Sequence, residues 1–148
     1  MVPGITTAQG AASRLLVSLT RRGEARRVQY ITGHGRGGAL PADIDWTSLA
    51  DPAVTTIVYM PTKTLPNLVE AALKTGLEPK TPAIAVVSAT RADERVIAAT
   101  IADLPRRLAA ERLAGPVIVM IGRVFDHLQS GASETARPPV QRPMPLAK

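Results

Sequence analysis

The sequence contains no cysteine, which excludes disulfides, cysteine-ligated zinc and thiol nucleophiles. Aromatic residues make up only 3% of the chain, too few and too dispersed to form a stacking platform for nucleic-acid bases. No apolar run approaches the roughly 20 residues that span a bilayer, and the first residues lack the pattern of a signal peptide. We therefore expect a cytoplasmic protein with neither a membrane nor a nucleic acid as its partner.

Residues for acid/base or metal chemistry are also scarce. The two histidines are isolated, His34 in a glycine-rich loop and His127 far along the chain, so neither a catalytic triad nor a metal-ligand spacing is visible. The loop at residues 33–38 matches neither the dinucleotide fingerprint nor the Walker spacing. We expect no catalytic side chain and no metal site.

Basic residues exceed acidic ones, 18 against 12, and the net charge of +6 favours an anionic partner such as a small polycarboxylate. The densest basic cluster flanks the end of the first expected helix. It is either a solvated polar face or a rim that binds substrate carboxylates. Its members are Arg14, Arg21, Arg22, Arg26 and Arg27.

Apolar patterning predicts one α/β domain built on a mixed five-stranded sheet with flanking helices. The expected strands are 27–32, 54–60, 83–87, 95–101 and 117–121, the fourth of which could also be read as a helix. The expected helices are 8–19, a short turn around Trp46, 65–75, and 104–113 with Asp103 as its cap. From Phe125 onward apolar anchors become rare, so we expect a domain at 1–124 and a flexible, disordered tail at 125–148.

Eight segments between residue 2 and about residue 125 carry a further signal: Val2-Pro3-Gly4-Ile5-Thr6, Leu19-Thr20-x-Arg22-Gly23, Thr32-Gly33-His34, Ile57-Val58-Tyr59-Met60, Leu65-Pro66, Thr81-Pro82, Arg95-Val96 with Thr100-Ile101-Ala102-Asp103, and Ile118-Val119 before Gly122. In this order and spacing they resemble the carboxy-terminal part of uroporphyrinogen-III C-methyltransferases, members of the tetrapyrrole methylase family.

The resemblance implies a two-domain fold with S-adenosylmethionine in the cleft between the domains. It also implies a homodimer that methylates uroporphyrinogen III to precorrin-2, on the way to sirohaem and cobalamin. This sequence would supply only the second domain, with the amino-terminal domain missing, and we expect the chain to be inactive alone. A sibling precorrin methyltransferase, or a basic α/β binding or assembly module without catalysis, are the alternatives.

Site residues follow from the same resemblance. The cofactor is expected to contact Thr6, Thr7, Met60, Ala89, Pro116 and Val117, and the substrate Arg21 and Arg22. Pro61 replaces a usual glycine and removes a backbone donor. Ser88-Ala89-Thr90 replaces Asn-Gly-Thr, and alanine does not readily adopt the positive φ that glycine allows.

Overall fold

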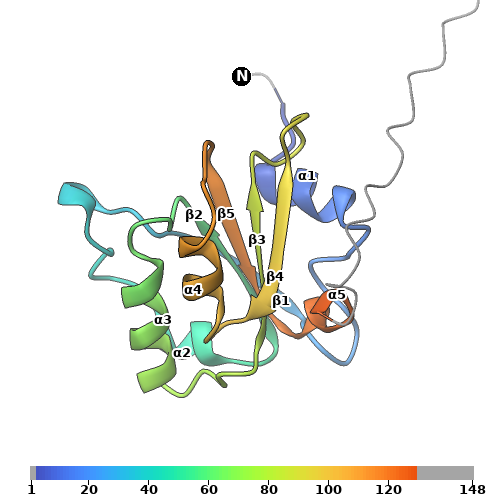
Figure 1. Cartoon of the computed structure of the whole chain (residues 1–148). Helices are drawn as coiled ribbons and strands as arrows, with labels where there is room; N and C mark the ends of the chain where they lie inside the picture. The colour runs from blue at the N-terminus through green and yellow to red at the C-terminus, as the bar shows by residue number, and fades with distance from the viewer. Residues whose placement is uncertain (1–2, 130–148) are drawn as a thin grey trace, which may run out of the picture.

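A five-stranded sheet of order β1-β2-β5-β3-β4 organises the computed structural model, which describes residues 3–129 (Figure 1). The strands β1 and β2 are parallel, whereas β2–β5, β5–β3 and β3–β4 are antiparallel pairs. The carboxyl ends of β1, β2 and β3 and the amino end of β5 therefore meet at one edge, which we call the carboxyl edge. The strands are β1 (Arg27–Thr32), β2 (Val54–Tyr59), β3 (Pro82–Val87), β4 (Arg95–Thr100) and β5 (Val117–Ile121).

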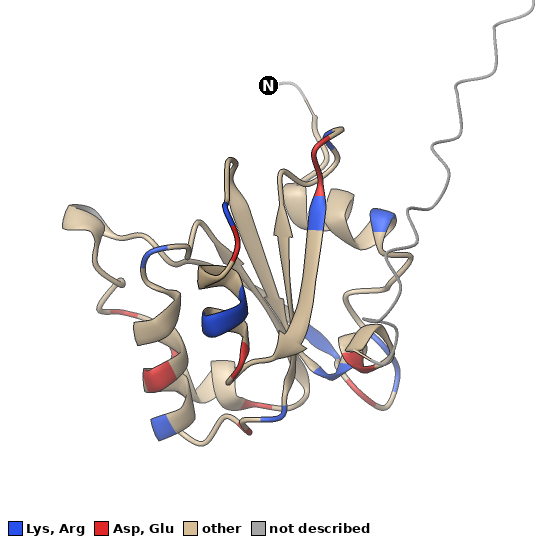
Figure 2. Cartoon of the chain, in the orientation of Figure 1, with Lys and Arg blue, Asp and Glu red and all other residues tan. Residues whose placement is uncertain are grey.

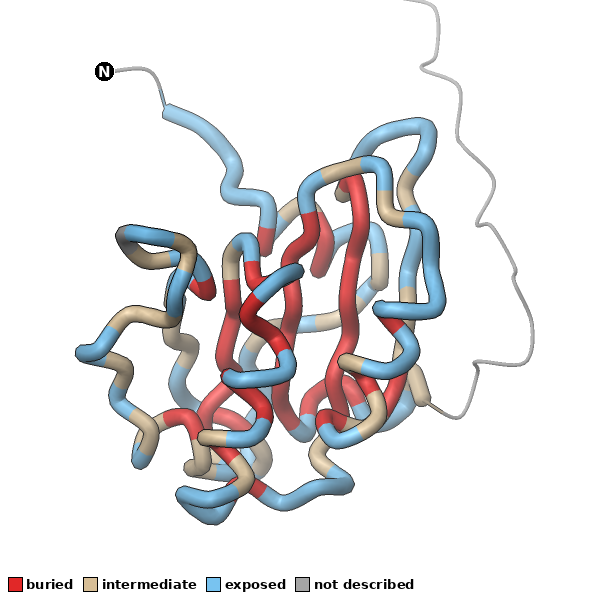
Figure 3. Tube along the Cα trace, turned by 60° about the vertical axis from the view of Figure 1, so that its left-hand side comes forward, coloured by how far each residue is buried: buried red, intermediate tan, exposed pale blue. Residues whose placement is uncertain are grey.

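Helices cover both faces of the sheet, because side chains in the strands alternate between two apolar layers. On β2, Val58 packs with the layer of α2, α3 and α4, and Ile57 with the layer of α1 and Phe125. The tube in Figure 3 is buried along the central strands and exposed in the outer loops. The helices are α1 (Thr7–Arg14), α2 (Trp46–Ala50), α3 (Leu65–Lys74), α4 (Leu104–Ala109) and α5 (Asp126–Gln129), with 3-10 turns η1 (Arg36–Gly38) and η2 (Arg123–Phe125).

All five predicted strands and the mixed sheet are confirmed, and residues 95–100 form a strand rather than a helix. Two helix ends were predicted wrongly. α1 ends at Arg14, because Leu16 takes a left-handed φ of 54° and is 88% exposed instead of continuing the apolar face. α4 ends at Ala109, and the Asp103 side chain does not cap it but accepts hydrogen bonds from Thr100 and Arg106.

The expected tail boundary at residue 125 is also wrong. Phe125 is fully buried in η2, and α5 follows directly. Gln129 Nε2 donates to the Ala99 carbonyl oxygen at 2.7 Å, which fixes α5 against β4. Residues 130–148, the rest of the expected tail, lie outside the described residues. No helix in the described part of the chain is long and apolar enough to cross a membrane.

Two adjacent threonines on β2 are buried in different environments. Gln29 Nε2 donates to Thr56 Oγ1 at 2.8 Å, whereas Thr55 Oγ1 has no hydrogen-bond partner among residues 3–129. A buried hydroxyl without a partner is destabilising, because folding removes it from water without compensation.

Thr55→Val should therefore raise the free energy of unfolding by about 1 kcal/mol, measured by urea denaturation. Thr56→Val is the matched control: it leaves the Gln29 amide without its acceptor and should lower the free energy of unfolding by about 1 kcal/mol. Equal losses in both variants would show that the Thr55 hydroxyl is satisfied.

Candidate functional site

The carboxyl edge brings together four of the six residues predicted to contact the cofactor. Met60 follows β2, Ala89 follows β3, Pro116 directly precedes β5 and Val117 is its first residue. Backbone hydrogen bonds join these segments: Met60 N–H donates to the Val117 carbonyl at 3.2 Å, and Ser88 N–H to the Pro116 carbonyl at 2.9 Å. The ends of three strands thus form one continuous backbone surface.

Backbone strain is concentrated at this edge. Met60, Ser88 and Thr90 adopt left-handed φ values of 53°, 50° and 67°, which side-chain-bearing residues rarely take. Each such residue costs of order 1 kcal/mol or more and persists only where its surroundings hold it, a situation typical of functional sites. Ala89, which stands where the family usually has glycine, is not among the residues with a positive φ; its two neighbours, Ser88 and Thr90, are.

Pro61 lies at the same edge, at the start of the turn that leads into α3. Its carbonyl accepts hydrogen bonds from the amides of Thr64 at 2.9 Å and Leu65 at 2.7 Å. A Cβ at Gly33 would lie 2.7 Å from the Pro61 Cα, so the end of β1 approaches Pro61 so closely that only glycine fits there. The segments that follow β1 and β2 are therefore in close contact at Gly33 and Pro61.

The remaining two predicted cofactor residues head α1. Thr6 caps the helix: its Oγ1 accepts the Gln9 amide at 3.2 Å, and Gln9 Oε1 accepts the Thr6 amide at 3.1 Å, a capping box. Further along α1, a Cβ at Gly10 would lie 2.9 Å from the Thr90 methyl group. The helix headed by Thr6 and Thr7 therefore packs against the turn that carries Ala89, and both threonines are exposed.

Ser88 also lies at the carboxyl edge, although it was not among the residues predicted to contact the cofactor. Its side chain is buried against Gly115, where an added Cβ would lie 2.1 Å from Ser88 Oγ. The Ser88 hydroxyl, by hydrogen bonding, holds the pKa of the Asp93 carboxyl below its usual value. Ser88 thus links the β3–β4 turn, residues 88–94, to the loop that enters β5.

Arg21 and Arg22 are not brought to the carboxyl edge. They lie in the turn before β1, where Arg21 bridges to Ala25 and pairs with Glu24 at 3.1 Å. After Ala25, the Arg26 amide donates a hydrogen bond to the carbonyl oxygen of Ala53, which directly precedes β2. This places both arginines at the amino ends of β1 and β2, the opposite end of the strands from Met60.

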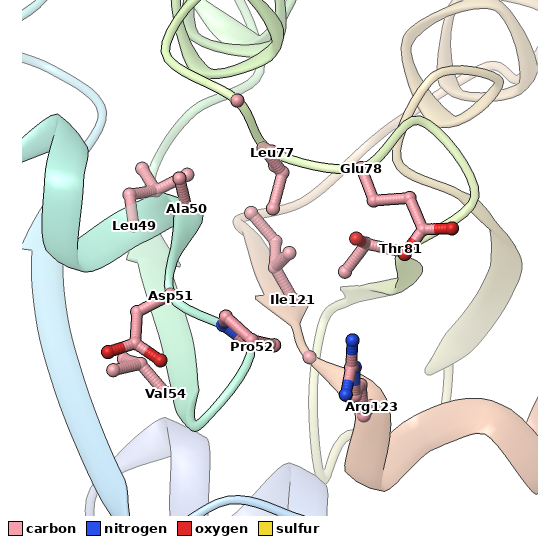
Figure 4. A pocket seen from close by; sticks show the side chains of 12 residues that line it. Leu49, Ala50, Asp51, Pro52, Val54, Leu77, Glu78, Thr81, Ile121 and Arg123 are labelled. Atoms are coloured by element: carbon pink, nitrogen blue, oxygen red, sulfur yellow. The ribbon is translucent and has the colours of Figure 1, made fainter.

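A hollow of about 170 Å³ lies at that opposite edge of the sheet (Figure 4). Leu77 and Ile121 form part of its apolar wall, and Asp51, Glu78 and Arg123 add charge. Asp51 is already paired with Arg27 and also accepts the Ala53 amide at 2.7 Å. No group of three or more possible metal ligands occurs in the described ranges, here or at the carboxyl edge.

Residues 1–105 match the model of the tetrapyrrole (corrin/porphyrin) methylases. The chain belongs to this family. It is 40% identical over 128 residues to a siroheme synthase of Gluconacetobacter diazotrophicus, covering 86% of the chain and 27% of the relative. It is 36% identical over 126 residues to the chloroplastic S-adenosyl-L-methionine-dependent uroporphyrinogen III methyltransferase of Arabidopsis thaliana, covering 85% of the chain and 34% of the relative.

Solved structures show the same fold. A uroporphyrin-III C-methyltransferase of Thermus thermophilus superposes with a TM-score of 0.66 at 32% identity, covering 87% of this chain and 53% of that one. A second T. thermophilus structure, of a uroporphyrin-III C-methyltransferase in complex with S-adenosylhomocysteine, superposes with a TM-score of 0.68 at 24% identity, covering 85% of this chain and 53% of that one. The chain therefore spans about half of these structures and between a quarter and about a third of the two curated relatives. The resemblance and the fold class stated from the sequence are both confirmed.

Proposed function

We propose that this chain forms the carboxy-terminal half of an S-adenosylmethionine-dependent C-methyltransferase acting on uroporphyrinogen III. The observation that carries the proposal is the carboxyl edge, where three residues take left-handed φ values and two of them, Met60 and Ser88, donate backbone hydrogen bonds to Val117 and Pro116 at the entry of β5. The formation of precorrin-2 and the pairing of two copies as a homodimer are the finer parts of the same proposal.

The residues at the edge suit a sulfonium cofactor. Met60 is 58% exposed, Ala89 is small, and the two threonines at the head of α1 are exposed, so the edge offers a partly apolar surface with polar groups. The cofactor would supply an electrophilic methyl group, which an electron-rich pyrrole carbon attacks without assistance from a strong base. The chain's own residues then have to bind and orient the two reactants, which agrees with the scarcity of acid/base residues.

The edge forms one side of a site. Ile5 is 83% exposed and Met60 58% exposed, so apolar side chains at the head of α1 and at the end of β2 face outward. Such residues gain stability when another surface covers them. We propose that the amino-terminal domain implied by the family resemblance covers them, and that the 148 residues alone do not turn over substrate.

Calorimetric titration with S-adenosylhomocysteine tests this function. The chain alone should bind weakly, whereas a chimera in which residue 1 is preceded by the segment of the G. diazotrophicus siroheme synthase that comes directly before its matched region should bind tightly and methylate uroporphyrinogen III. Tight binding by the chain alone would overturn the need for a second domain. A folded chimera that binds no cofactor would support the non-catalytic binding module instead.

Two exposed residues with nearly the same backbone provide a matched pair for the chimera. Met60 and Leu16 have φ values of 53° and 54° and are 58% and 88% exposed, but only Met60 lies at the carboxyl edge. Met60→Gln should weaken cofactor binding about tenfold, and Leu16→Gln should leave it within about twofold. Equal affinities in the two variants would remove Met60 from the site.

A further inference from the structure

Glu94 is a carboxylate in an unusual position in the β3–β4 turn. Its side chain is only 11% exposed, although it lies at the end of a hairpin. Oε1 accepts a hydrogen bond from Arg14 Nε at 3.1 Å, and Oε2 accepts one from the Thr90 amide at 2.5 Å. The two carboxylate oxygens of Glu94 thus accept hydrogen bonds from two different segments of the chain.

Burying a carboxylate is costly unless donors replace the water it loses. Here one donor is the last residue of α1 and the other lies in the β3–β4 turn, 80 and 4 residues away in sequence. Figure 2 shows the acidic end of the β3–β4 hairpin close to α1. The carboxylate therefore connects the helix headed by Thr6 to the turn that carries Ala89.

The contact between these two segments leaves little room for adjustment. Thr90 is a β-branched residue with a left-handed φ of 67°, and its methyl group would lie 2.9 Å from a Cβ at Gly10. The hydrogen bond from its amide to Glu94 holds this strained conformation. Without the acceptor, the turn would relax toward common backbone angles and α1 would lose its support.

We propose that Glu94 is a positioning residue that fixes α1 and the β3–β4 turn at a set separation. The threonines at the head of α1 and Ala89 in the turn then stay aligned with each other in the proposed cofactor site. That this alignment serves cofactor binding rests on the proposed function. That Glu94 holds the two segments together rests on the contacts of Arg14, Thr90 and Gly10. Glu94 touches neither reactant and acts through the segments it joins.

Amide hydrogen exchange of the 148-residue chain without ligand tests the geometry. Glu94→Ala should speed exchange of the Thr90 amide at least about tenfold and also speed exchange in α1. Glu94→Gln keeps an oxygen acceptor, so Thr90 exchange should stay within about threefold of the parent while α1 exchange increases. Glu70→Ala removes an exposed glutamate paired with Lys74 on α3 and should change neither region.

The cofactor affinity of the chimera tests the positioning role. Glu94→Ala should weaken S-adenosylhomocysteine binding about tenfold, Arg14→Met and Glu94→Gln about threefold, and Glu70→Ala not at all. Unchanged affinity in a folded Glu94→Ala chimera, or unchanged Thr90 exchange in the chain, would overturn the proposal. If the parent chimera binds no cofactor, the proposed function fails, and the exchange rates alone still decide whether Glu94 holds the two segments.

Discussion

Phe125→Ala should lower the free energy of unfolding by about 3–5 kcal/mol, the range for removing a buried aromatic ring from a core. Phe125 is 0% exposed and packs in one apolar cluster with Ala8 and Ala11 of α1 and Ile57 of β2. The loss combines the transfer of apolar surface with the cavity that remains. Because α1 packs in the same cluster, its amides should also exchange faster.

Urea denaturation measures this effect, and the exposed neighbour Asp126 provides the control. Asp126→Ala should change the free energy of unfolding by no more than about 0.5 kcal/mol. A chain ending at residue 124 should be destabilised at least as much as Phe125→Ala. If that shortened chain were as stable as the full one, Phe125 would not belong to the core.

Gly115→Ala should destabilise the domain by about 1–3 kcal/mol, because the new methyl group would occupy the place of the Ser88 hydroxyl. The added Cβ would lie 2.1 Å from Ser88 Oγ but 3.4 Å from Ser88 Cβ, which is an ordinary contact. Removing the hydroxyl should therefore make room. Ser88→Ala combined with Gly115→Ala should be more stable than the sum of the single losses predicts.

A double-mutant cycle in urea measures this coupling, which should be about 1–2 kcal/mol in favour of the double variant. The strained φ of 50° at Ser88 is common to serine and alanine, so it cancels in the cycle. Gly4→Ala serves as the control, since an added Cβ there meets nothing within 4 Å. Simple additivity of the two losses would show that the segments adjust independently.

The strands were predictable because each is a short apolar or β-branched run between turn signals, and β2, β3 and β5 are almost wholly buried. Helix ends were less predictable. Leu15 and Leu16 continue an apolar spacing, yet the helix ends before them and Leu16 faces solvent. The local apolar pattern does not show at which residue tertiary packing stops stabilising a further helical turn.

The expected cofactor residues came from the family resemblance, and four of them lie together because the ends of β2 and β3 and the start of β5 meet at one edge of the sheet. The contacts that hold this candidate site together could not be predicted from the sequence. Arg14 and Glu94 are 80 residues apart, and nothing in either local pattern indicates that they meet. Arg21 and Arg22 were expected to bind substrate from the family resemblance and from their charge, and charge density carries no information about the edge of the sheet at which a turn lies.

The last strand in the sequence lies in the middle of the sheet, with β2 on one side and β3 on the other. The β1–β2 and β3–β4 pairs can each form earlier, but they have no direct contact as neighbouring strands and remain two separate ribbons until β5 is inserted. During synthesis, completion of the sheet therefore waits for residue 121 to leave the ribosome. Until then, both ribbons present open edges to other chains, so the nascent polypeptide is most prone to aggregation just before its final strand emerges.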